Sequence, residues 1–421
     1  MNVNAPADLQ LFSEDREDFW AYGSAYRAET FSRLRSELPV SFHEEFDIPD
    51  FGRGPGFFAV TKFEDIQHVS AHADIFCSGR GTNIPDLPPG IDEFMGSIIN
   101  MDAPKHTRIR KIVNKAFTPR RVEEISDDVR RKARAIIAKM APLGECDFIE
   151  NLAAPLPLQI ICEMMGIPEE HWHRVFELTN IILGGGDPEL TPDVTTLMNA
   201  VLELAALGQA VGEDRLENPT DDLVSAIMHA EVDGHRLSAQ EMASFFILLC
   251  AAGNETTRTA TAHGILQLTR HPDQKAIWQS DPATWTPIAI EEVVRYATPV
   301  VHFRRTATQD TELRGVPIPE GSKVVMWYES ANRDEDKIND PFTFDITRSP
   351  NDHLGFGAAG PHFCLGANLA RRELSIIFEE IFRWLPDLEI TSDPDYLQSS
   401  FIHGIKRMRC EFTPTEVDVD A

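Results

Sequence analysis

One stretch of the chain constrains the fold more than any other, because residues 238–270 carry a helical pattern without an internal proline. The stretch opens with Ser238 and Glu241, the spacing of a capping box, and stops just before Pro272. At about 1.5 Å per residue such a helix spans roughly 50 Å, so it must cross the molecule. Its first half, residues 245–252, is apolar on every side, which predicts a position in the core.

Helical periodicity also dominates the rest of the chain. Two short runs rich in β-forming residues, 57–61 and 323–328, each follow a glycine-containing turn and predict a small sheet. Further helices are expected over 102–117, 121–140, 156–165, 169–183, 221–229, 285–296 and 365–384. We therefore predict a mainly α single domain over residues 1–421, with a large helical lobe and a minor β-rich lobe. The first ~30 and last ~8 residues are expected to be peripheral.

Charge and composition exclude several classes of function. A formal net charge of −28 argues against nucleic acid as a partner, because phosphate binding needs basic groups. The N-terminal residues lack the pattern of a signal peptide, and no run of about eighteen apolar residues occurs, so we expect a cytoplasmic protein without a membrane span. The six cysteines are scattered without CxxC pairs, which predicts free thiols unless one binds a metal.

The middle of the long helix contains residues that are unusual in a buried helix. Gly253 costs about 1 kcal/mol relative to alanine in a helix interior, and Glu255 is a potential charge in a buried element. Thr256 adds a hydroxyl that competes for backbone carbonyls. Glu255 could simply face a water-filled cleft. Alternatively, a groove beside Ala252 holds a small ligand next to an acid and an alcohol, Glu255 and Thr256, that deliver protons.

A glycine-rich loop at residues 355–366 contains Cys364 and precedes a predicted helix. A single buried cysteine is more often an inert core residue. Here, however, the backbone N–H groups and the helix dipole are expected to stabilise a thiolate, and Gly366 allows a close approach of the backbone. The loop lacks the Gly-Lys-Ser/Thr sequence of a phosphate-binding loop.

Two sets of charged residues add to this picture. Glu292 and Arg295 share a helix face, and Arg348 is the candidate third member of a buried ion-pair network, although such pairs are also common on exposed helices. Basic groups that could bind the two carboxylates of a large apolar, planar cofactor are His106, Arg110, Arg305 and His362. Each of these four taken alone could be a surface residue.

Irregular segments at 78–100 and 184–188 are expected to border a substrate pocket, although both could be plain surface connections. The predicted pocket residues are Ile84, Leu87, Phe94, Met95, Ile98, Ile99, Ile182, Leu183, Leu248, Ala252, Val300, Val301 and Phe401. A basic island lies between residues 105 and 134 of this acidic chain. It is either a solvated helix face or a docking site for a small acidic protein, near Lys105, Lys111, Lys115, Arg120 and Arg121.

These motifs, in this order and at these separations, resemble those of the cytochrome P-450 family over nearly the whole chain. The resemblance implies a P-450 fold and haem b, with Cys364 as the axial thiolate ligand to iron. It also implies haem contacts from His106, Arg110, Arg305, His362, Phe356, Gly366 and Ala252, and proton delivery by Glu255 and Thr256. The loop departs from the commonest pattern, because Phe356 stands eight positions before Cys364 and Gly357 takes the seventh.

The longer cysteine loop and the segments 157–166 and 401–406 resemble actinobacterial enzymes that hydroxylate the terminal methyl of methyl-branched lipids or steroid side chains. This resemblance implies a monooxygenase that receives electrons from NAD(P)H through a ferredoxin reductase and a ferredoxin. Alternatives are a monooxygenase of a terpenoid or another secondary metabolite, a peroxide-driven haem-thiolate peroxygenase and a non-catalytic haem sensor.

Overall fold

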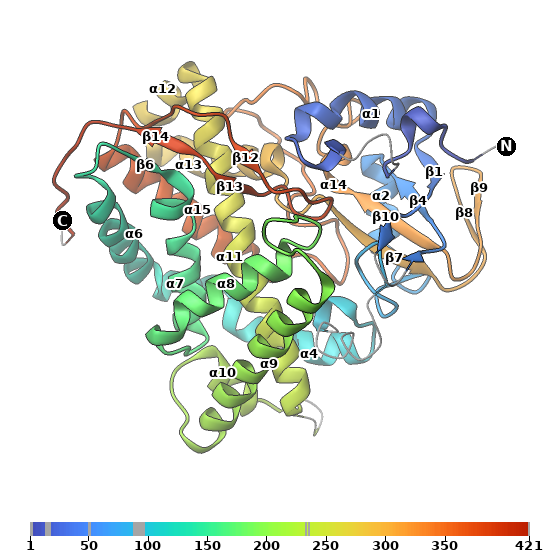
Figure 1. Ribbon diagram of the computed structural model, residues 1–421, viewed down its shortest axis with the longest axis horizontal. Helices are drawn as coiled ribbons and strands as arrows, with labels where there is room; N and C mark the ends of the chain where they lie inside the picture. The colour runs from blue at the N-terminus through green and yellow to red at the C-terminus, as the bar shows by residue number, and fades with distance from the viewer. Residues whose placement is uncertain are drawn as a thin grey trace.

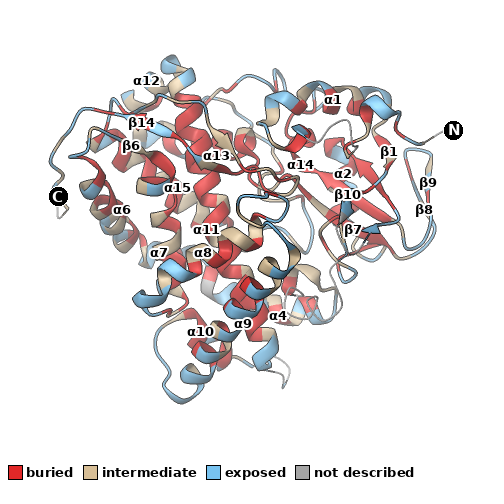
Figure 2. Ribbon diagram, in the orientation of Figure 1, coloured by how far each residue is buried: buried red, intermediate tan, exposed pale blue. Residues whose placement is uncertain are grey.

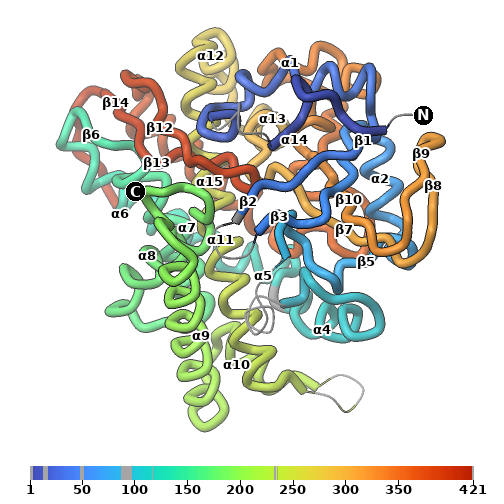
Figure 3. The backbone as a smooth tube through the Cα atoms, turned by 45° about the vertical axis from the view of Figure 1, so that its right-hand side comes forward, coloured from blue at the N-terminus to red at the C-terminus, as the bar shows by residue number. Residues whose placement is uncertain are grey.

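The computed structural model describes residues 3–12, 18–48, 52–86, 97–231, 234 and 236–419. A large helical lobe and a smaller lobe built on a sheet lie side by side in Figure 1, and the turned view of Figure 3 separates them again. The mainly α architecture expected from the sequence is confirmed. The helices are α1 (Ser24–Glu37), α2 (Phe63–Ala71), α4 (Lys105–Val113), α5 (Pro119–Glu124), α6 (Ser126–Met140), α7 (Pro155–Met164), α8 (Trp172–Leu183), α9 (Val194–Glu217), α10 (Leu223–Met228), α11 (Ala239–Arg270), α12 (Pro272–Ser280), α13 (Pro282–Ala297), α14 (Tyr328–Ala331) and α15 (Ala367–Trp384).

The long helix is α11, and its capping box is formed. The Ser238 side chain accepts a hydrogen bond from the Glu241 backbone N–H, and the Glu241 carboxylate accepts one from the Ser238 backbone N–H. Figure 2 shows α11 running through the centre of the helical lobe with most of its residues buried. Helix α11 is therefore the central helix of this lobe, because other helices pack around it: α7, α8, α9, α13 and α15.

The main sheet has five strands in the order β1 (Val40–His43), β4 (Phe57–Val60), β10 (Lys323–Trp327), β7 (His302–Ala307) and β5 (Phe76–Cys77). The two predicted strands are β4 and β10, and they pair in parallel with Lys323 opposite Phe57. A second sheet of three strands joins β11 (Glu389–Ile390), β14 (Arg409–Glu411) and β6 (Glu145–Asp147). Two-stranded pairs are β2 (Asp47–Ile48) with β3 (Gly52–Arg53), β8 (Thr311–Leu313) with β9 (Val316–Ile318), and β12 (Asp395–Tyr396) with β13 (Ile405–Arg407).

The N-terminal segment does not lie at the periphery, contrary to expectation. Leu9, Leu11, Phe19 and Trp20 are buried, and the Trp20 ring stacks on Trp327 of β10 at a centroid distance of 5.2 Å. These apolar residues are spaced irregularly, so they produce no periodic signal in the sequence. Tertiary packing alone shows that they cover one face of the sheet.

Helix α9 was absent from the predicted helices because it contains Gly208 and Gly212, which weaken a helical pattern. A Cβ at Gly208 would lie only 2.8 Å from Cγ of Phe246, so this glycine allows α9 to approach α11 closely. In the described part of the chain, α9 is also the one helix whose length and apolar composition suit a membrane span. Its buried residues, among them Val201 and Leu204, belong to the core around α11, and they make up 33% of its most apolar stretch.

Candidate active site

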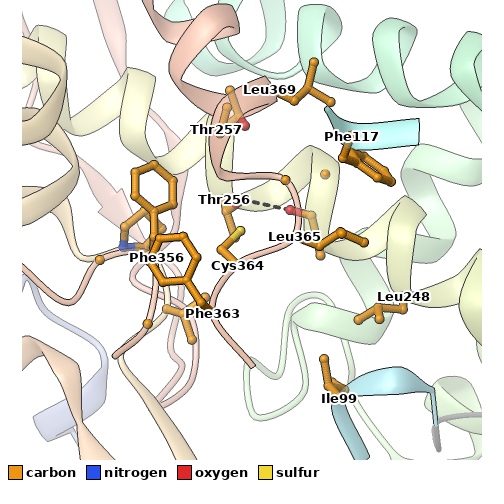
Figure 4. Close-up of a pocket in the computed structure, with 18 of the residues that line it drawn as sticks. Ile99, Phe117, Leu248, Thr256, Thr257, Phe356, Phe363, Cys364, Leu365 and Leu369 are labelled. Atoms are coloured by element: carbon orange, nitrogen blue, oxygen red, sulfur yellow. Dashed lines mark hydrogen bonds between the residues drawn. The ribbon is translucent and has the colours of Figure 1, made fainter. Parts of the chain in front are cut away.

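A cavity of about 220 Å³ lies between α11 and the loop that precedes α15. Its wall is mostly apolar, and its charged and titratable groups are few. Figure 4 shows side chains from α11, α15, the loop and the segment around Ile99 directed toward the same space. The wall residues are Ile98, Ile99, His106, Arg110, Phe117, Ile161, Leu248, Leu249, Ala252, Gly253, Thr256, Thr257, Ala260, Val294, Pro299, Val300, Phe303, Tyr328, Gly355, Phe356, Gly357, His362, Phe363, Cys364, Leu365, Gly366, Leu369, Ala370, Glu373 and Leu374.

The cysteine loop is closed by its own backbone. The Cys364 N–H donates to the carbonyl oxygen of Phe356 at 3.0 Å, so eight positions of separation still give a closed turn. Gly357 and Gly360 have φ values of 84° and 146°, and a Cβ at Gly360 would lie 2.4 Å from the Ser70 carbonyl oxygen. The glycines are therefore required by local geometry, and the loop presents the Cys364 thiol to the cavity.

Opposing influences act on the pKa of the Cys364 thiol. Enclosure by the surrounding protein raises this pKa, against the opposing influence of a backbone hydrogen bond at Gly366 and of the Arg110 and Arg371 charges. An anionic sulfur at this position needs a further positive charge. A metal cation at the sulfur would provide it, because coordination deprotonates a thiol outright.

On α11, Ala252 and Thr256 face the cavity. The Thr256 hydroxyl donates to the Ala252 carbonyl oxygen at 2.7 Å, which is the hydrogen bond drawn in Figure 4. Gly253 lies against Ile161 of α7, where an added Cβ would be 3.1 Å from two side-chain carbons. The glycine in this helix thus serves close helix packing as well as the shape of the cavity.

Glu255 does not accompany Thr256 into the cavity wall. Its carboxylate is buried and forms an ion pair with Arg258 on the same helix, and it accepts a weaker hydrogen bond from the Thr259 hydroxyl at 3.4 Å. Arg258 in turn donates to the Asn180 side chain on α8. Because adjacent helix positions point about 100° apart, Glu255 and Thr256 face different neighbours.

Three of the four basic groups predicted to bind carboxylates, His106, Arg110 and His362, line the cavity. Arg305 does not line it, but its charge acts on both His106 and His362. The His106 and His362 rings lie 4.2 Å apart, and Arg110 donates to the carbonyl oxygen of Phe363 at 2.7 Å. Buried Arg305 donates to the Arg304 carbonyl oxygen, and no described carboxylate forms an ion pair with it. Burial lowers the pKa of Arg305, and burial together with Arg305 lowers that of His362 to about 3.

These basic groups fit a cofactor that carries carboxylates. His106 Nε2 is buried and has no hydrogen-bond partner in the described structure, and the Arg305 charge lacks a counter-ion there. Buried cations are normally paired, and an anionic group beside them would stabilise them. Together with the apolar walls and the Cys364 thiol, they match an iron-containing planar cofactor with two carboxylates. Haem therefore fits this site.

Glu292, Arg295 and Arg348 form a buried network behind the loop. Arg295 donates to both carboxylate oxygens of Glu292 at 2.7 Å, and Arg348 donates to one of them at 3.2 Å. Glu292 also accepts hydrogen bonds from the Asp345 backbone and the Asn351 side chain. The network therefore ties α13 to the segment that leads into the cysteine loop.

The predicted pocket residues divide into three groups. Ile98, Ile99, Leu248, Ala252 and Val300 line the cavity. The remaining described residues do not line it. Ile84 and Val301 pack in the core beneath the N-terminal segment, and Ile182 packs in the core around α11. Leu183 is the last residue of α8, and Phe401 packs on the rings of His302 and Phe303. Leu87, Phe94 and Met95 lie outside the described residues.

Val300 and Val301 illustrate why this assignment fails from sequence. Neighbouring positions in extended backbone point in opposite directions, so one valine faces the cavity while the other is buried in the core. Phe303 lines the cavity, although it was not predicted to do so. Its ring packs against that of Phe401, which does not line the cavity. The tertiary placement of β7 decides which residues are accessible.

Glu373 is a further wall residue that sequence reasoning missed. It is fully buried on α15, and burial raises the pKa of its carboxyl to about 8, against the opposing hydrogen bond with Thr257. A signal was present, because Glu373 falls between Leu369 and Ile377 on the apolar stripe of an otherwise amphipathic helix. Because Glu373 stands next to other charged residues in the sequence, its position on the apolar stripe is difficult to recognise.

The basic island is only partly available for docking. Lys105 forms an ion pair with Glu241, and Arg120 and Arg121 both pair with Glu124. Lys111 and Lys115 are exposed, and no described carboxylate forms an ion pair with either. The surface near α4 and α5 thus keeps some unpaired positive charge.

Comparison with known proteins places the chain among bacterial haem enzymes. The family model for cytochrome P450 matches residues 284–398. The methyl-branched lipid omega-hydroxylase of Mycobacterium tuberculosis is 50% identical over 405 residues, covering 96% of this chain and 94% of that protein. The steroid C26-monooxygenase of Mycolicibacterium smegmatis is 40% identical over 394 residues, covering 91% of this chain and 90% of that protein.

A solved structure with a similar fold is a Mycobacterium marinum cytochrome P450 in complex with pseudoionone. It superimposes with a TM-score of 0.92 at 41% identity and covers 98% of this chain and 100% of that chain. A cytochrome P450 from Bacillus megaterium in complex with testosterone gives a TM-score of 0.82 at 30% identity, covering 91% and 97%. Both structures therefore share the fold over more than nine tenths of this chain.

Proposed function

Because the chain belongs to the cytochrome P450 family, we propose that it is a haem-thiolate monooxygenase that hydroxylates the terminal methyl of a methyl-branched lipid or of a steroid side chain. The observation that carries this proposal is the placement of the Cys364 thiol and the Thr256 hydroxyl in the wall of one apolar cavity. The alternative, an inert core thiol, does not explain a cysteine presented to a cavity by a loop whose glycines adopt positive φ values.

In this proposal, Cys364 ligates the haem iron, and His106, Arg110, Arg305 and His362 bind the carboxylates of the cofactor. When bound, a thiolate-ligated haem supplies oxygen activation for insertion into an unactivated C–H bond. Two observations support this placement of the carboxylates: His106 Nε2 has no hydrogen-bond partner among the described residues, and no described carboxylate forms an ion pair with buried Arg305. Phe356, Gly366 and Ala252 also line the cavity and would contact the cofactor.

Thr256 is the residue that holds and passes a proton at the cavity wall. Its hydroxyl already donates to the Ala252 carbonyl oxygen, so its own oxygen remains free to accept a hydrogen bond. Glu255 acts as the acid of this pair from behind the helix, and its ion pair with Arg258 must open for the carboxyl to reach the cavity side. Glu292, Arg295 and Arg348 hold the backbone behind the cysteine loop.

An extended apolar substrate suits the remaining wall. Ile98, Ile99, Leu248 and Val300 offer apolar contacts and no charge, which favours a hydrocarbon chain over a polar metabolite. The mycobacterial relatives named for methyl-branched lipids and for steroid C26 support this substrate class. A terpenoid substrate is the alternative, and the pseudoionone complex of the similar structure is its support.

We further propose that electrons come from NAD(P)H through a ferredoxin reductase and a ferredoxin that docks near Lys111 and Lys115. The docking region includes Lys105, Arg120 and Arg121, whose ion pairs with Glu241 and Glu124 compete with an acidic partner. Salt should slow this association, because exposed charges are screened beyond about 10 Å at 0.1 M ionic strength.

The decisive experiment uses the haem-loaded protein with a methyl-branched fatty acid, a sterol with a saturated side chain and pseudoionone. A spin-state change of the ferric haem on titration reports binding, and mass spectrometry after turnover with dioxygen and a ferredoxin system reports the position of hydroxylation. Terminal hydroxylation of the lipid or sterol supports the proposal. Turnover of pseudoionone alone, turnover with peroxide alone, or binding without product would instead indicate a terpenoid monooxygenase, a peroxygenase or a sensor.

A further inference from the structure

Cys146 and Cys410 form a pair of thiols remote from the catalytic loop. Cys146 lies on β6 and Cys410 on β14, and the two are directly opposite one another in the antiparallel register. Their sulfur atoms are 3.7 Å apart. Cys410 is fully buried, whereas Cys146 is partly exposed, so a small reagent can reach one thiol of the pair.

The backbone at this pair suits a covalent bond between the sulfurs. Two positions away on either side, the Phe412 N–H donates to the Gly144 carbonyl oxygen and the Phe148 N–H donates to that of Met408. Cys146 and Cys410 therefore occupy a hydrogen-bonded pair of the ladder, where Cα atoms are about 5.5 Å apart. Disulfides form at Cα separations of about 4.4–6.8 Å, so rotation of the two side chains is sufficient.

The two thiols also differ in reactivity. The hydrogen bond between them lowers the pKa of Cys146 and raises that of Cys410, and burial acts further against ionisation of Cys410. The Arg409 charge favours the Cys146 thiolate, while Asp147 and Glu150 oppose it. Cys146 is also the partly exposed thiol of the pair, so we assign it as the nucleophile and buried Cys410 as the thiol that attacks the oxidised Cys146.

We propose that Cys146 and Cys410 are a redox-active pair in which hydrogen peroxide forms an intramolecular disulfide that ties the C-terminal strand β14 to β6. The Cys146 thiolate attacks one peroxide oxygen, which breaks the O–O bond and leaves a sulfenic acid and one water molecule. The Cys410 sulfur then displaces the sulfenic oxygen as a second water. Both electrons come from the sulfurs, and a dithiol reductant reverses the reaction.

The test treats the haem-loaded full-length protein with hydrogen peroxide and, in parallel, with the thiol-specific oxidant diamide, which spares the haem. Thiols are titrated after denaturation, and peptides are mapped by mass spectrometry. We expect a loss of two titratable thiols, a linked pair of peptides containing Cys146 and Cys410, and recovery with dithiothreitol. The oxidised protein should melt at a higher temperature, because the new bond closes a loop through most of the chain.

Three variants make the result specific. Cys146→Ser and Cys410→Ser should each abolish the linked peptides, whereas Cys77→Ser, which removes a buried thiol of β5, should leave them in place. An unchanged thiol titre in excess diamide would overturn the proposal. So would overoxidation of Cys146 with Cys410 left free, or a bond between two protein molecules. None of these outcomes depends on the substrate or on turnover.

Discussion

The Glu255 carboxylate and the Arg258 guanidinium form a buried ion pair one helical turn apart on α11. This contact holds the acidic residue of the Ala-Gly-Asn-Glu-Thr-Thr segment behind the helix while its neighbour Thr256 faces the cavity. The acid and the alcohol are adjacent in sequence, but their side chains leave α11 in directions about 100° apart. Any proton transfer between them requires water or a rearrangement of this ion pair.

Arg258→Met should therefore destabilise the protein strongly. Removing one partner of a buried ion pair leaves an uncompensated charge, at a cost of about 3–5 kcal/mol in the free energy of unfolding. Arg174→Met is the matched control, because Arg174 pairs with Glu177 and Glu203 on the exposed surface, where the loss should stay below about 1 kcal/mol. Urea denaturation measures both values. Equal small losses would show that Glu255 is not held by Arg258.

Cys364→Ala should abolish thiolate ligation of the haem. The reduced carbon monoxide adduct of the wild type is expected to show the strongly red-shifted Soret band of a thiolate ligand, because the sulfur donates electron density to the iron. The variant should lose that band, while Cys77→Ala should retain it. A red-shifted band that persisted in the Cys364 variant would require another thiolate from this chain.

Thr256→Ala should leave haem and substrate binding intact but divert reducing equivalents to peroxide. The reason is that the variant lacks the hydroxyl oxygen that accepts a hydrogen bond at the cavity wall. The measurement is the ratio of product and peroxide formed to NAD(P)H consumed. Thr256→Ser keeps the hydroxyl and should restore coupling, and unchanged coupling in the alanine variant would remove Thr256 from proton delivery.

Glu292→Gln should cost about 3–5 kcal/mol in the free energy of unfolding, because it leaves the buried Arg295 charge without a counter-ion. The substitution also replaces the charged carboxylate that accepts hydrogen bonds from Arg348 and from the Asp345 N–H. Glu124→Gln on the exposed surface should lower the free energy of unfolding far less, because solvent screens its ion pairs with Arg120 and Arg121. Denaturation by urea, followed by circular dichroism and by haem absorbance, distinguishes these outcomes.

Glu373 should make stability fall with rising pH. The pKa of its carboxyl is about 8 in the folded protein, whereas an unfolded glutamate has a pKa of about 4.3. Between these values the folded state binds a proton that the unfolded state has lost, so raising the pH favours unfolding. Glu373→Gln removes this dependence, and its stability relative to wild type should rise between about pH 4.3 and pH 8. Parallel curves for the two proteins would contradict the prediction.

Local patterns were sufficient for the elements and motifs that depend on sequence neighbours. The capping box of Ser238 and Glu241, the length of α11 and the β4 and β10 strands follow from short-range spacing, and the structure confirms them. The glycines of the cysteine loop could also be interpreted locally, because positive φ values require small residues. The sequence by itself thus determined the mainly α fold and the motifs that carry the family resemblance.

The direction of each side chain was decided by tertiary packing. Glu255, Val301 and Glu373 follow the same local rules as their neighbours, yet one turns to Arg258, one enters the core and one lines the cavity. The pairing of Cys146 with Cys410 likewise arises only when the C-terminal strand adds to β6. Rotation of a helix or strand against its neighbours sets which side chains meet, and long-range contacts that set this rotation leave no periodic trace in the sequence.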